Sequence, residues 1–445
     1  MARVHLIAIG GSAMHNLALE LQAQGNQVSG SDDHFFEPSR GRLKAASLLP
    51  DQEGWFPDRI TSDIDMIILG MHAQKDNPEL VRAQKLGLAI MSYPEYLYEQ
   101  SKDCTRVVVA GSHGKTSITS MVLHVMRQVG QSVNYLVGAQ IDGFDRMVRL
   151  DPNADFIVIE GDEYGSSPLD PKPKFLWYKP HIALISGIAW DHANIFPSKE
   201  RYKAQFAAFI RTIEDSGTLL YCGEDKDLET LVSAQEVSIR TLPYSTPESK
   251  PAEEGCLLLA PEGEVPLKIF GGHNMQNLEG ARLICNRLGV MDDEFYEAIT
   301  SFIGASQRLE RVAENESGLY FRDFAHAPSK VRATVKAVRE QYPGRQLIAL
   351  LELHTFSSLN PNFLPQYAGS LDAADQAMVT FDPQVVRQKR LPELNAQLLT
   401  DHFQREDLQV ITQADRLPQE LEKHRSENTV FLLMSSGNFA GQILF

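Results

Sequence analysis

Short apolar runs alternate with amphipathic segments along the whole chain. The apolar runs are rich in β-branched residues and include "VHLIAIGG", "TRVVVAG", "DFIVIEGDE" and "HIALISGIAW". After Lys115 the apolar positions instead follow helical spacing, with a glycine at position 130 as a stop; they are Ile118, Met121, Val122, Val125, Met126 and Val129. This alternation predicts helices between buried parallel strands, which is the α/β class.

The pattern repeats in three blocks, which suits a chain of 445 residues at roughly 100–200 residues per domain. We expect the first domain at residues 1–103, the second at 104–301 and the third at 302–445. The third block carries the strand-like runs "QLIALLE", "QAMVTF", "LQVIT" and "TVFLLM". Inside the second block the polar, Pro-rich stretch "TPESKPAEEG" predicts a surface excursion.

Composition narrows the function classes. Hydrophobic residues make up 43% of the chain and charged residues 22%, as in ordinary globular proteins. A net charge of −16 disfavours nucleic acid and anionic membranes as partners, and favours small-molecule substrates. No apolar run approaches the roughly 18 residues of a membrane span, so we expect a cytoplasmic protein. The four cysteines contain no CxxC pair and predict neither disulfides nor a zinc site.

The stretch "VVVAGSHGKTS" joins a predicted strand to the predicted helix after Lys115. Unpaired backbone N–H groups and the positive end of the helix dipole favour phosphate at such a junction. Lys115 would reach the β- and γ-phosphates and the Thr116 hydroxyl would bind Mg²⁺. The loop is shorter than the usual motif because Val109 stands at its first glycine, and the alternative is a structural turn. The phosphate loop comprises Gly111, Ser112, His113, Gly114, Lys115, Thr116 and Ser117.

Acidic residues follow two further predicted strands. Glu160 ends "FIVIE", with Asp162 and Glu163 just beyond it, and Asp191 and His192 follow "IALISGIAW". Carboxyl ends of neighbouring parallel strands meet at one edge of a sheet, so these groups can reach the metal at the phosphate loop. We predict Thr116, Glu160 and His192 as magnesium ligands; a solvated acidic strand end is the alternative reading for either strand alone.

Six stretches together resemble the Mur ligases of peptidoglycan synthesis. In chain order they are "AGSHGKTS", "EGDEYGSS", "AWDHANIF", "GGHNMQN", "SFIGASQRLE" and "DFAHAP". The resemblance spans nearly the whole chain and implies three domains: a Rossmann-like N-terminal domain, a central P-loop ATPase domain and a Rossmann-like C-terminal domain. It also implies an ATP- and Mg²⁺-dependent ligase that activates the lactyl carboxylate of UDP-N-acetylmuramate as an acyl phosphate.

The resemblance assigns roles around ATP. His273, Asn274 and Asn277 would line the adenine pocket, with helix capping as the alternative for the asparagines. Arg308 would contact the transferred phosphate and Asp323 the ribose, with His326 close by and facing the phosphates or the incoming amine. In the second case its imidazole could help to deprotonate that amine.

In the first domain the turn "AIGGSAMHN" would approach the pyrophosphate of UDP-N-acetylmuramate through Gly10, Gly11 and Ser12. Asp32 would bind a nucleoside hydroxyl or base edge, and His72 and Asn77 are further expected contacts. Ala8 and Ala13 stand where a dinucleotide fingerprint has glycine, which favours a UDP-sugar over NAD.

One departure concerns a carbamylated lysine that some Mur ligases use to bridge metals. Phe206 occupies the aligned position and Lys203 is out of register, which leaves the ligands of a second Mg²⁺ open.

The choice of amine rests on "PKFLWYKPHIALISGIAWDHANIF", which most resembles members that accept the tripeptide L-alanyl-γ-D-glutamyl-meso-diaminopimelate. The alternative is L-alanine itself. Rival classes are a P-loop kinase or NTPase switch and a non-catalytic binding protein on the same fold.

Overall fold

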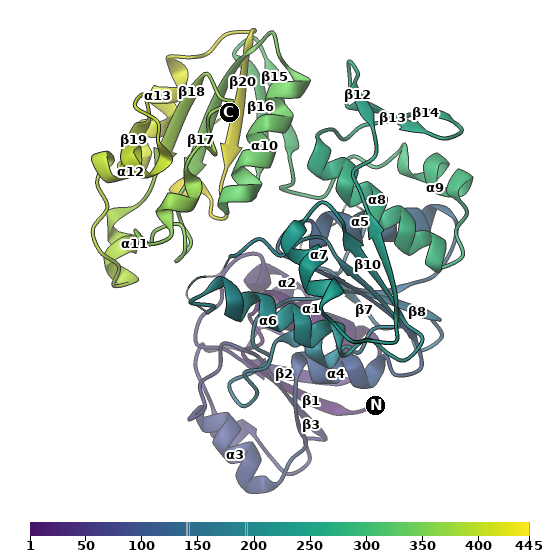
Figure 1. Cartoon of the computed structure of the whole chain (residues 1–445). Helices are drawn as coiled ribbons and strands as arrows, with labels where there is room; N and C mark the ends of the chain where they lie inside the picture. Colours follow the sequence, from purple (N-terminus) through teal and green to yellow (C-terminus); the bar gives the residue numbers. More distant parts are fainter. Residues whose placement is uncertain (139–140, 142, 192, 194, 445) are drawn as a thin grey trace.

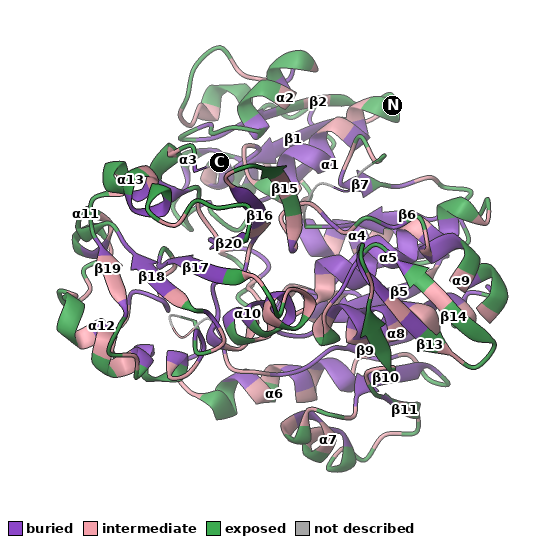
Figure 2. Ribbon diagram, turned by 90° about the horizontal axis from the view of Figure 1, so that it is seen from above, coloured by how far each residue is buried: buried purple, intermediate pink, exposed green. Residues whose placement is uncertain are grey.

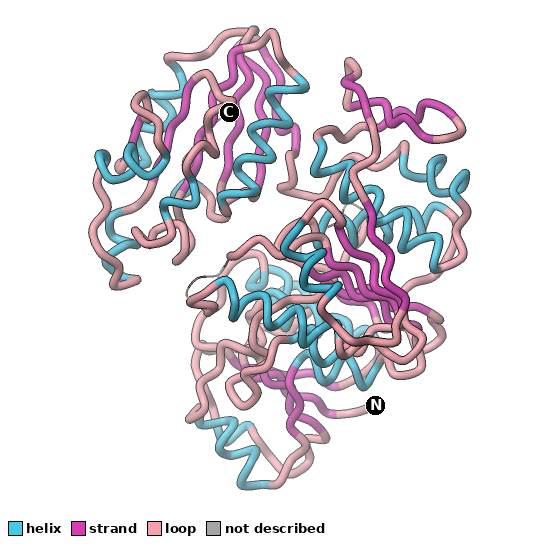
Figure 3. The backbone as a smooth tube through the Cα atoms, in the orientation of Figure 1, coloured by secondary structure: helices cyan, strands magenta, loops and turns pink. Residues whose placement is uncertain are grey.

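The structure is a computed structural model that describes residues 1–138, 141, 143–191, 193 and 195–444, and its strands form four sheets (Figure 1). Three of these sheets are mainly parallel and alternate with helices, which confirms the predicted α/β class. Each large sheet belongs to one of the three predicted blocks (Figure 3). The exact domain boundaries stay predictions.

The N-terminal sheet has the order β2-β1-β3-β4 with all pairings parallel. Its strands are β1 (Arg3–Ile7), β2 (Gln27–Ser31), β3 (Met66–Leu69) and β4 (Ile90–Ser92). Its helices are α1 (Ser12–Ala23), α2 (Ser39–Ala45), η1 (Pro57–Arg59), α3 (Pro78–Leu86) and α4 (Tyr93–Gln100). The turn between β1 and α1 therefore lies at the carboxyl edge of the sheet, where ligands bind in open α/β folds.

The central sheet has seven strands in the order β11-β10-β9-β5-β8-β6-β7, and only β7 is antiparallel to its neighbour. The strands are β5 (Thr105–Ala110), β6 (Asn134–Leu136), β7 (Val148–Arg149), β8 (Phe156–Glu160), β9 (Ile182–Ile185), β10 (Thr218–Cys222) and β11 (Arg240–Tyr244). The helices are α5 (Lys115–Gln128), η2 (Lys174–Trp177), α6 (Lys199–Ile210), α7 (Lys226–Ser233), α8 (Gly272–Arg287) and α9 (Asp292–Ile299). Figure 2 shows the middle of this sheet as buried.

β5 lies between β8 and β9: the strands that follow it directly in sequence, β6 to β8, lie on one side of it, and the later strands, β9 to β11, lie on the other. Such a reversal of strand order opens a crevice at the carboxyl ends of the strands. The predicted phosphate loop follows β5 into this crevice, and α5, α8 and α9 pack against one another beside it.

A small antiparallel sheet lies between the central sheet and the third domain in sequence. It contains β12 (Ser249–Pro251), β13 (Cys256–Ala260) and β14 (Gly263–Leu267). β12 is exposed along its whole length, which agrees with the predicted surface excursion. Figure 1 shows this sheet projecting from the central domain.

The C-terminal sheet has the order β15-β16-β20-β17-β18-β19, and only β15 is antiparallel. Its strands are β15 (Glu310–Asn315), β16 (Gly318–Asp323), β17 (Gln346–Glu352), β18 (Gln376–Thr380), β19 (Gln409–Ile411) and β20 (Thr429–Met434). Its helices are α10 (Pro328–Gln341), η3 (Leu364–Tyr367), α11 (Pro383–Gln388), α12 (Ala396–Phe403), η4 (Ala414–Arg416), α13 (Leu417–Glu422) and η5 (Phe439–Gly441).

Helix α1 of the first domain forms hydrogen bonds with the central domain. The carboxylate of Glu20 accepts a hydrogen bond from the backbone N–H of Leu150 at 2.9 Å, and Asn16 accepts one from Met147 at 3.2 Å. Because α1 begins at Ser12, these contacts also fix the predicted sugar-nucleotide turn relative to the central domain.

Two further findings concern the cysteines and the helices of the described part of the chain. The four cysteines are buried and none forms a disulfide. No described helix combines the length and the apolar character needed to cross a bilayer.

Candidate active site at the meeting of three domains

The phosphate loop has the backbone shape that its glycines allow. Gly111 has φ 124° and Gly114 has φ 74°, in the region where a side chain is strained. A β-carbon at Gly114 would collide with the side-chain oxygen of Asn277 on α8, and one at Gly111 would collide with the hydroxyl of Ser186. The loop thus leads from β5 to the N-terminus of α5, where N–H groups face an anion.

Lys115 already has an anionic partner. Its ammonium group lies 3.1 Å from Glu163 Oε2 and 2.9 Å from the Gly111 carbonyl oxygen. Burial lowers the pKa of Lys115, but the carboxylates of Glu163 and Asp162 outweigh burial and raise it overall. Tyr202 donates a hydrogen bond to the other Glu163 oxygen at 3.2 Å. A triphosphate would therefore replace a carboxylate as the partner of an ammonium group that is already charged.

The predicted metal ligands Thr116 and Glu160 lie together. The Thr116 hydroxyl donates to Glu160 Oε2 at 3.3 Å, while Glu160 Oε1 is buried without a hydrogen-bond partner among the described residues. Burial and the neighbouring Asp162 raise the pKa of Glu160 to about 7. A divalent cation would satisfy this oxygen and favour the ionised carboxylate, so the pair fits Mg²⁺, which prefers oxygen ligands.

The third predicted ligand, His192, lies outside the described residues. Its neighbour Asp191 is 2% exposed. Within the described ranges no group of three His, Cys, Asp or Glu side chains is arranged to hold a metal ion.

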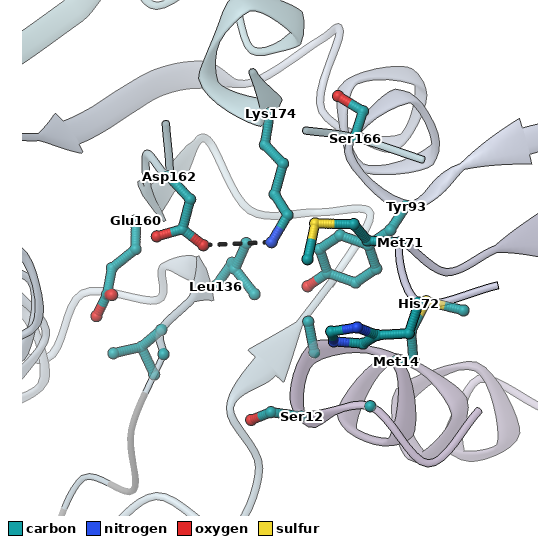
Figure 4. Close-up of a pocket in the computed structure, with 14 residues that line it drawn as sticks. Ser12, Met14, Met71, His72, Tyr93, Leu136, Glu160, Asp162, Ser166 and Lys174 are labelled. Atoms are coloured by element: carbon teal, nitrogen blue, oxygen red, sulfur yellow. Dashed lines mark hydrogen bonds and ion pairs between the residues drawn. The ribbon is translucent and has the colours of Figure 1, made fainter. Parts of the chain in front are cut away.

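A cavity of about 210 Å³ separates the first domain from the metal ligands (Figure 4). Its walls come from the β1–α1 turn, the loop after β3 and the ends of β6 and β8. The described lining residues are Gly11, Ser12, Ala13, Met14, Met71, His72, Tyr93, Leu136, Val137, Gly138, Glu160, Asp162, Ser166 and Lys174. The cavity therefore joins three predicted substrate contacts, Gly11, Ser12 and His72, to the predicted metal ligand Glu160.

Two other predicted substrate contacts have structural partners. Asp32 accepts a hydrogen bond from the Gly10 N–H at 2.8 Å, which fixes the turn before α1. The Asn77 side chain is 4% exposed and accepts hydrogen bonds from the N–H groups of Glu79 and Leu80, so it caps α3. Neither Asp32 nor Asn77 is among the described residues that line the cavity. Their contacts with substrate stay predictions that this geometry does not support.

A second cavity, of about 160 Å³, lies where the central and C-terminal domains meet. Its lining includes Asn274, Arg308 and the aromatic residues Phe270, Phe321 and Tyr342, together with the charged residues Glu253, Glu254, Lys268 and Arg311. Asn274 is 8% exposed and donates a hydrogen bond to the Phe270 carbonyl oxygen at 2.9 Å. The aromatic residues, the amide and the guanidinium group are chemistry that can bind a flat nitrogenous base.

The other two predicted residues of the "GGHNMQN" motif, His273 and Asn277, lie on α8 together with Asn274. Asn277 contacts the phosphate loop at Gly114, as described above. Burial lowers the pKa of His273 to about 4, so this imidazole is neutral at physiological pH. The start of α8 thus contributes Asn274 to the 160 Å³ cavity and Asn277 to the surroundings of the phosphate loop.

The C-terminal domain contributes Arg308 and Asp323. The Arg308 guanidinium lies 4.6 Å from the centre of the Phe324 ring. Burial lowers the pKa of Arg308, and the carboxylates of Asp323 and Glu160 oppose this effect, so both carboxylates lie within electrostatic reach. Asp323 accepts hydrogen bonds from the N–H groups of Leu309 and Ala325, each at 2.6 Å. Asp323 therefore shapes the loop that carries Arg308.

His326 has a defined ring orientation. Its Nδ1 lies 2.9 Å from the Phe324 carbonyl oxygen, which can only accept a hydrogen bond. Nδ1 must therefore carry the proton, and in the neutral ring Nε2 has the lone pair that a base needs. His326 is 7% exposed.

Both ends of α10 contact the central domain. Near its start, the Ser329 hydroxyl lies 2.6 Å from Nε2 of His113 in the phosphate loop. At its end, the Gln341 amide donates to the carbonyl oxygens of Ala252 and Gly255 at 2.8 and 2.9 Å, next to the small sheet. Helix α10 thus spans the contact between the two domains.

Three family models match consecutive parts of the chain. They are described as Mur ligase family, catalytic domain, over residues 3–103; Mur ligase middle domain, over residues 109–285; and Mur ligase, glutamate ligase domain, over residues 307–437. The UDP-N-acetylmuramate–L-alanine ligase of Mycobacterium marinum is 30% identical over 430 residues, which are 90% of this chain and 85% of the relative. The chain belongs to the Mur ligase family.

Solved structures share the fold of this Mur ligase. The UDP-N-acetylmuramate–alanine ligase of Thermotoga maritima aligns with a TM-score of 0.74 at 20% identity, covering 99% of this chain and 97% of that chain. The UDP-N-acetylmuramate:L-alanyl-γ-D-glutamyl-meso-diaminopimelate ligase of Neisseria meningitides aligns with a TM-score of 0.61 at 26% identity, covering 68% and 98%. As a Mur ligase, the chain is an ATP-dependent ligase of the peptidoglycan pathway that forms amide bonds.

Phe206, which the resemblance aligns with the carbamylated lysine of some Mur ligases, has a packing role here. Phe206 is fully buried, with its ring centroid 5.6 Å from that of Phe175 and 5.2 Å from that of Tyr202. Lys203 instead lies 2.7 Å from Asp227 on the outer helix α7. The ligands of a second Mg²⁺ stay open.

Several polar groups of this Mur ligase site are not among the residues predicted from the sequence. Tyr93 and Lys174 line the 210 Å³ cavity. Lys330, one residue beyond Ser329, is a further polar group of the site. Burial lowers the pKa of its ammonium group, while the nearby carboxylates of Asp191 and Glu163 act to raise it. A lone tyrosine or lysine carries no local signal, because these residues approach the site only through packing between domains. Lys174 could have been predicted, because it lies in "PKFLW", part of the stretch that already distinguished the chain within its family.

Proposed function

We propose that this Mur ligase joins the lactyl carboxylate of UDP-N-acetylmuramate to the amine of L-alanyl-γ-D-glutamyl-meso-diaminopimelate, the murein tripeptide. The observation that carries the proposal is the 210 Å³ cavity, which runs from Ser12 and His72 to Glu160. A sugar nucleotide held by the first domain can extend its acyl group through this cavity toward the phosphate loop. A kinase or a GTPase-like switch has no need of such a connection.

The three domains divide the ligands among them in this proposal. Residues 1–103 bind UDP-N-acetylmuramate, residues 104–301 bind ATP and residues 302–445 bind the amine. Adenine lies in the 160 Å³ cavity beside Asn274, and the phosphates lie along the loop from Gly111 to Ser117. The contact of Asn277 with Gly114 fixes the position of the adenine cavity relative to the phosphate loop.

The first step makes the carboxylate reactive. A carboxylate oxygen attacks the γ-phosphorus of ATP, the bond from that phosphorus to the β–γ bridging oxygen breaks, and the electron pair leaves with ADP. Lys115 and Arg308 neutralise charge on the transferring group. When bound by Thr116 and Glu160, Mg²⁺ supplies further charge neutralisation on the phosphates.

The second step forms the amide. The neutral amine attacks the acyl carbon, inorganic phosphate leaves with the electron pair of the broken C–O bond, and the nitrogen loses a proton. Nε2 of His326 is the proposed acceptor of that proton. A His326→Ala variant that keeps its full rate at neutral pH would exclude this role.

The identity of the amine has a second candidate. The curated relative from Mycobacterium marinum uses L-alanine by name, whereas the Neisseria structure is of a ligase named for the tripeptide. The stretch from Pro173 to Phe196 favours the tripeptide by its resemblance to the latter group.

Parallel assays of phosphate release test both the proposed ligase activity and the identity of the amine. Purified protein with Mg-ATP and UDP-N-acetylmuramate receives either L-alanine or the tripeptide. We expect rapid release only with the tripeptide; release only with L-alanine would reassign the amine. Release that needs no sugar nucleotide would indicate an NTPase switch, and no release with either amine would indicate a binding protein.

A further inference from the structure

Lys174 is the only lysine or arginine among the described residues that line the 210 Å³ cavity. Its side chain is 16% exposed, and its ammonium group lies 3.3 Å from Asp162 Oδ2. Asp162 and Glu160 make the central-domain wall of the cavity acidic. A substrate carboxylate that enters beside them needs a cation to offset the repulsion.

The chain holds Lys174 in place by a hydrogen-bonded loop that begins directly after β8. The Lys174 N–H donates to the Tyr164 carbonyl oxygen at 2.8 Å, and Gly165 forms a β-bridge with Pro173. The next residue, Phe175, is fully buried and stacks on Phe209 with ring centroids 4.6 Å apart. The backbone of Lys174 is thus fixed, while its ammonium group can exchange partners within the cavity.

Tyr93 faces the same cavity from the first domain. The residue is 4% exposed, and its hydroxyl has no hydrogen-bond partner among the described residues. Burial and the charge of Asp162 raise the pKa of Tyr93 well above its usual value, so the hydroxyl keeps its proton and can donate. A buried hydroxyl without a partner destabilises the fold, and a bound acceptor would remove that penalty. Figure 4 shows Tyr93 and Lys174 directed into one space.

We propose that the Lys174 ammonium group and the Tyr93 hydroxyl bind the lactyl carboxylate of the substrate and hold it for phosphorylation. This inference rests on the proposed function. Lys174 exchanges Asp162 for the substrate and binds one carboxylate oxygen, which leaves the other oxygen to attack the γ-phosphorus. The same ammonium group then stabilises the negative charge that develops on the acyl oxygen when the amine attacks.

Calorimetric binding of two sugar nucleotides tests the proposal, because UDP-N-acetylglucosamine lacks the lactyl carboxylate of UDP-N-acetylmuramate. For Lys174→Met we expect affinity for UDP-N-acetylmuramate to fall about 10- to 100-fold, as for loss of a charged hydrogen bond. For Tyr93→Phe we expect a loss of about 3- to 10-fold. Binding of UDP-N-acetylglucosamine should be unchanged in both variants.

Matched controls come from the same elements. Lys172→Met removes an exposed lysine of the same loop, and Tyr98→Phe removes a hydroxyl from the same helix, α4. Both should bind the two nucleotides like the wild type. Lys174→Arg should recover part of the lost affinity and of kcat, whereas Lys174→Met should lower kcat even at saturating substrate.

Three outcomes would overturn the proposal. An equal loss for both nucleotides would assign Lys174 to the shared UDP-sugar part, and a loss no larger than in Lys172→Met would give it no role in binding. A wild-type enzyme that does not bind UDP-N-acetylmuramate would refute the proposed function itself and this proposal with it. The first two outcomes would overturn only the role of Lys174 and leave the proposed function intact.

Discussion

Replacement of Ser329 by alanine should loosen the contact between the C-terminal domain and the phosphate loop. The Ser329 hydroxyl lies 2.6 Å from Nε2 of His113, and burial lowers the pKa of His113 to about 3, so this is a bond to a neutral imidazole. A neutral hydrogen bond contributes about 0.5–1.5 kcal/mol, which shifts a closed–open equilibrium by about 2- to 12-fold. The apparent KM for ATP should rise by up to the same factor, because it scales inversely with the fraction of closed molecules.

Phosphate-release kinetics and small-angle scattering with both nucleotides measure this effect. In wild type we expect the scattering profile to become more compact when ATP and UDP-N-acetylmuramate bind, and in Ser329→Ala to become less so. Ser329→Thr keeps the hydroxyl and should behave as wild type, as should Ser317→Ala in the turn between β15 and β16. An unchanged KM together with an unchanged profile in Ser329→Ala would refute the reasoning.

Three further predictions follow from the site. Gly114→Ala should abolish ATP turnover, because a side chain at φ 74° costs about 1–2 kcal/mol and collides with Asn277; turnover near the wild-type rate in a folded variant would contradict this. Glu160→Gln should raise the Mg²⁺ concentration for half-maximal activity by at least about 10-fold in a metal titration, and an unshifted titration would exclude Glu160 as a ligand. Asp32→Asn should flatten the dependence of stability on pH. Burial and Asp33 raise the pKa of Asp32 to about 6, so the folded state retains a proton that the unfolded state has lost between about pH 4 and pH 6. Wild-type stability in urea should therefore fall as pH rises through this window, by about 1–3 kcal/mol, and an equal fall in Asp32→Asn would contradict the assignment.

Local patterns were sufficient to predict the elements that carry the nucleotide. The apolar positions after Lys115 predicted α5, and five of them, from Ile118 to Met126, are at most 1% exposed. The predicted stop agrees with the structure, because α5 ends at Gln128 and Gly130 has φ 75°. Helical periodicity and glycine conformation are local properties, so they are readable without knowledge of the tertiary fold.

Contacts between distant segments were not predictable in the same way. The partner of Lys115 is Glu163, 48 positions later, and no residue pattern distinguishes it from Asp162. Asn77 and Asp32 were predicted to contact the substrate, but in the structure the polar group of Asn77 caps a helix and that of Asp32 stabilises a turn. The antiparallel sheet formed by β12, β13 and β14 was also missed, because its first strand is polar and exposed on every residue.

Helix α10 is held at both ends by hydrogen bonds to the central domain, so a tilt about one end displaces the other. From Ser329 to Gln341 the helix is roughly 18 Å long at about 1.5 Å per residue. If the two hydrogen bonds of Gln341 act as the pivot, a tilt of about 10° displaces the Ser329 end by roughly 3 Å. A small rocking of the last domain would thus break the bond to His113 outright, so the nucleotide loop would sense the position of the amine-binding domain in an almost all-or-none manner.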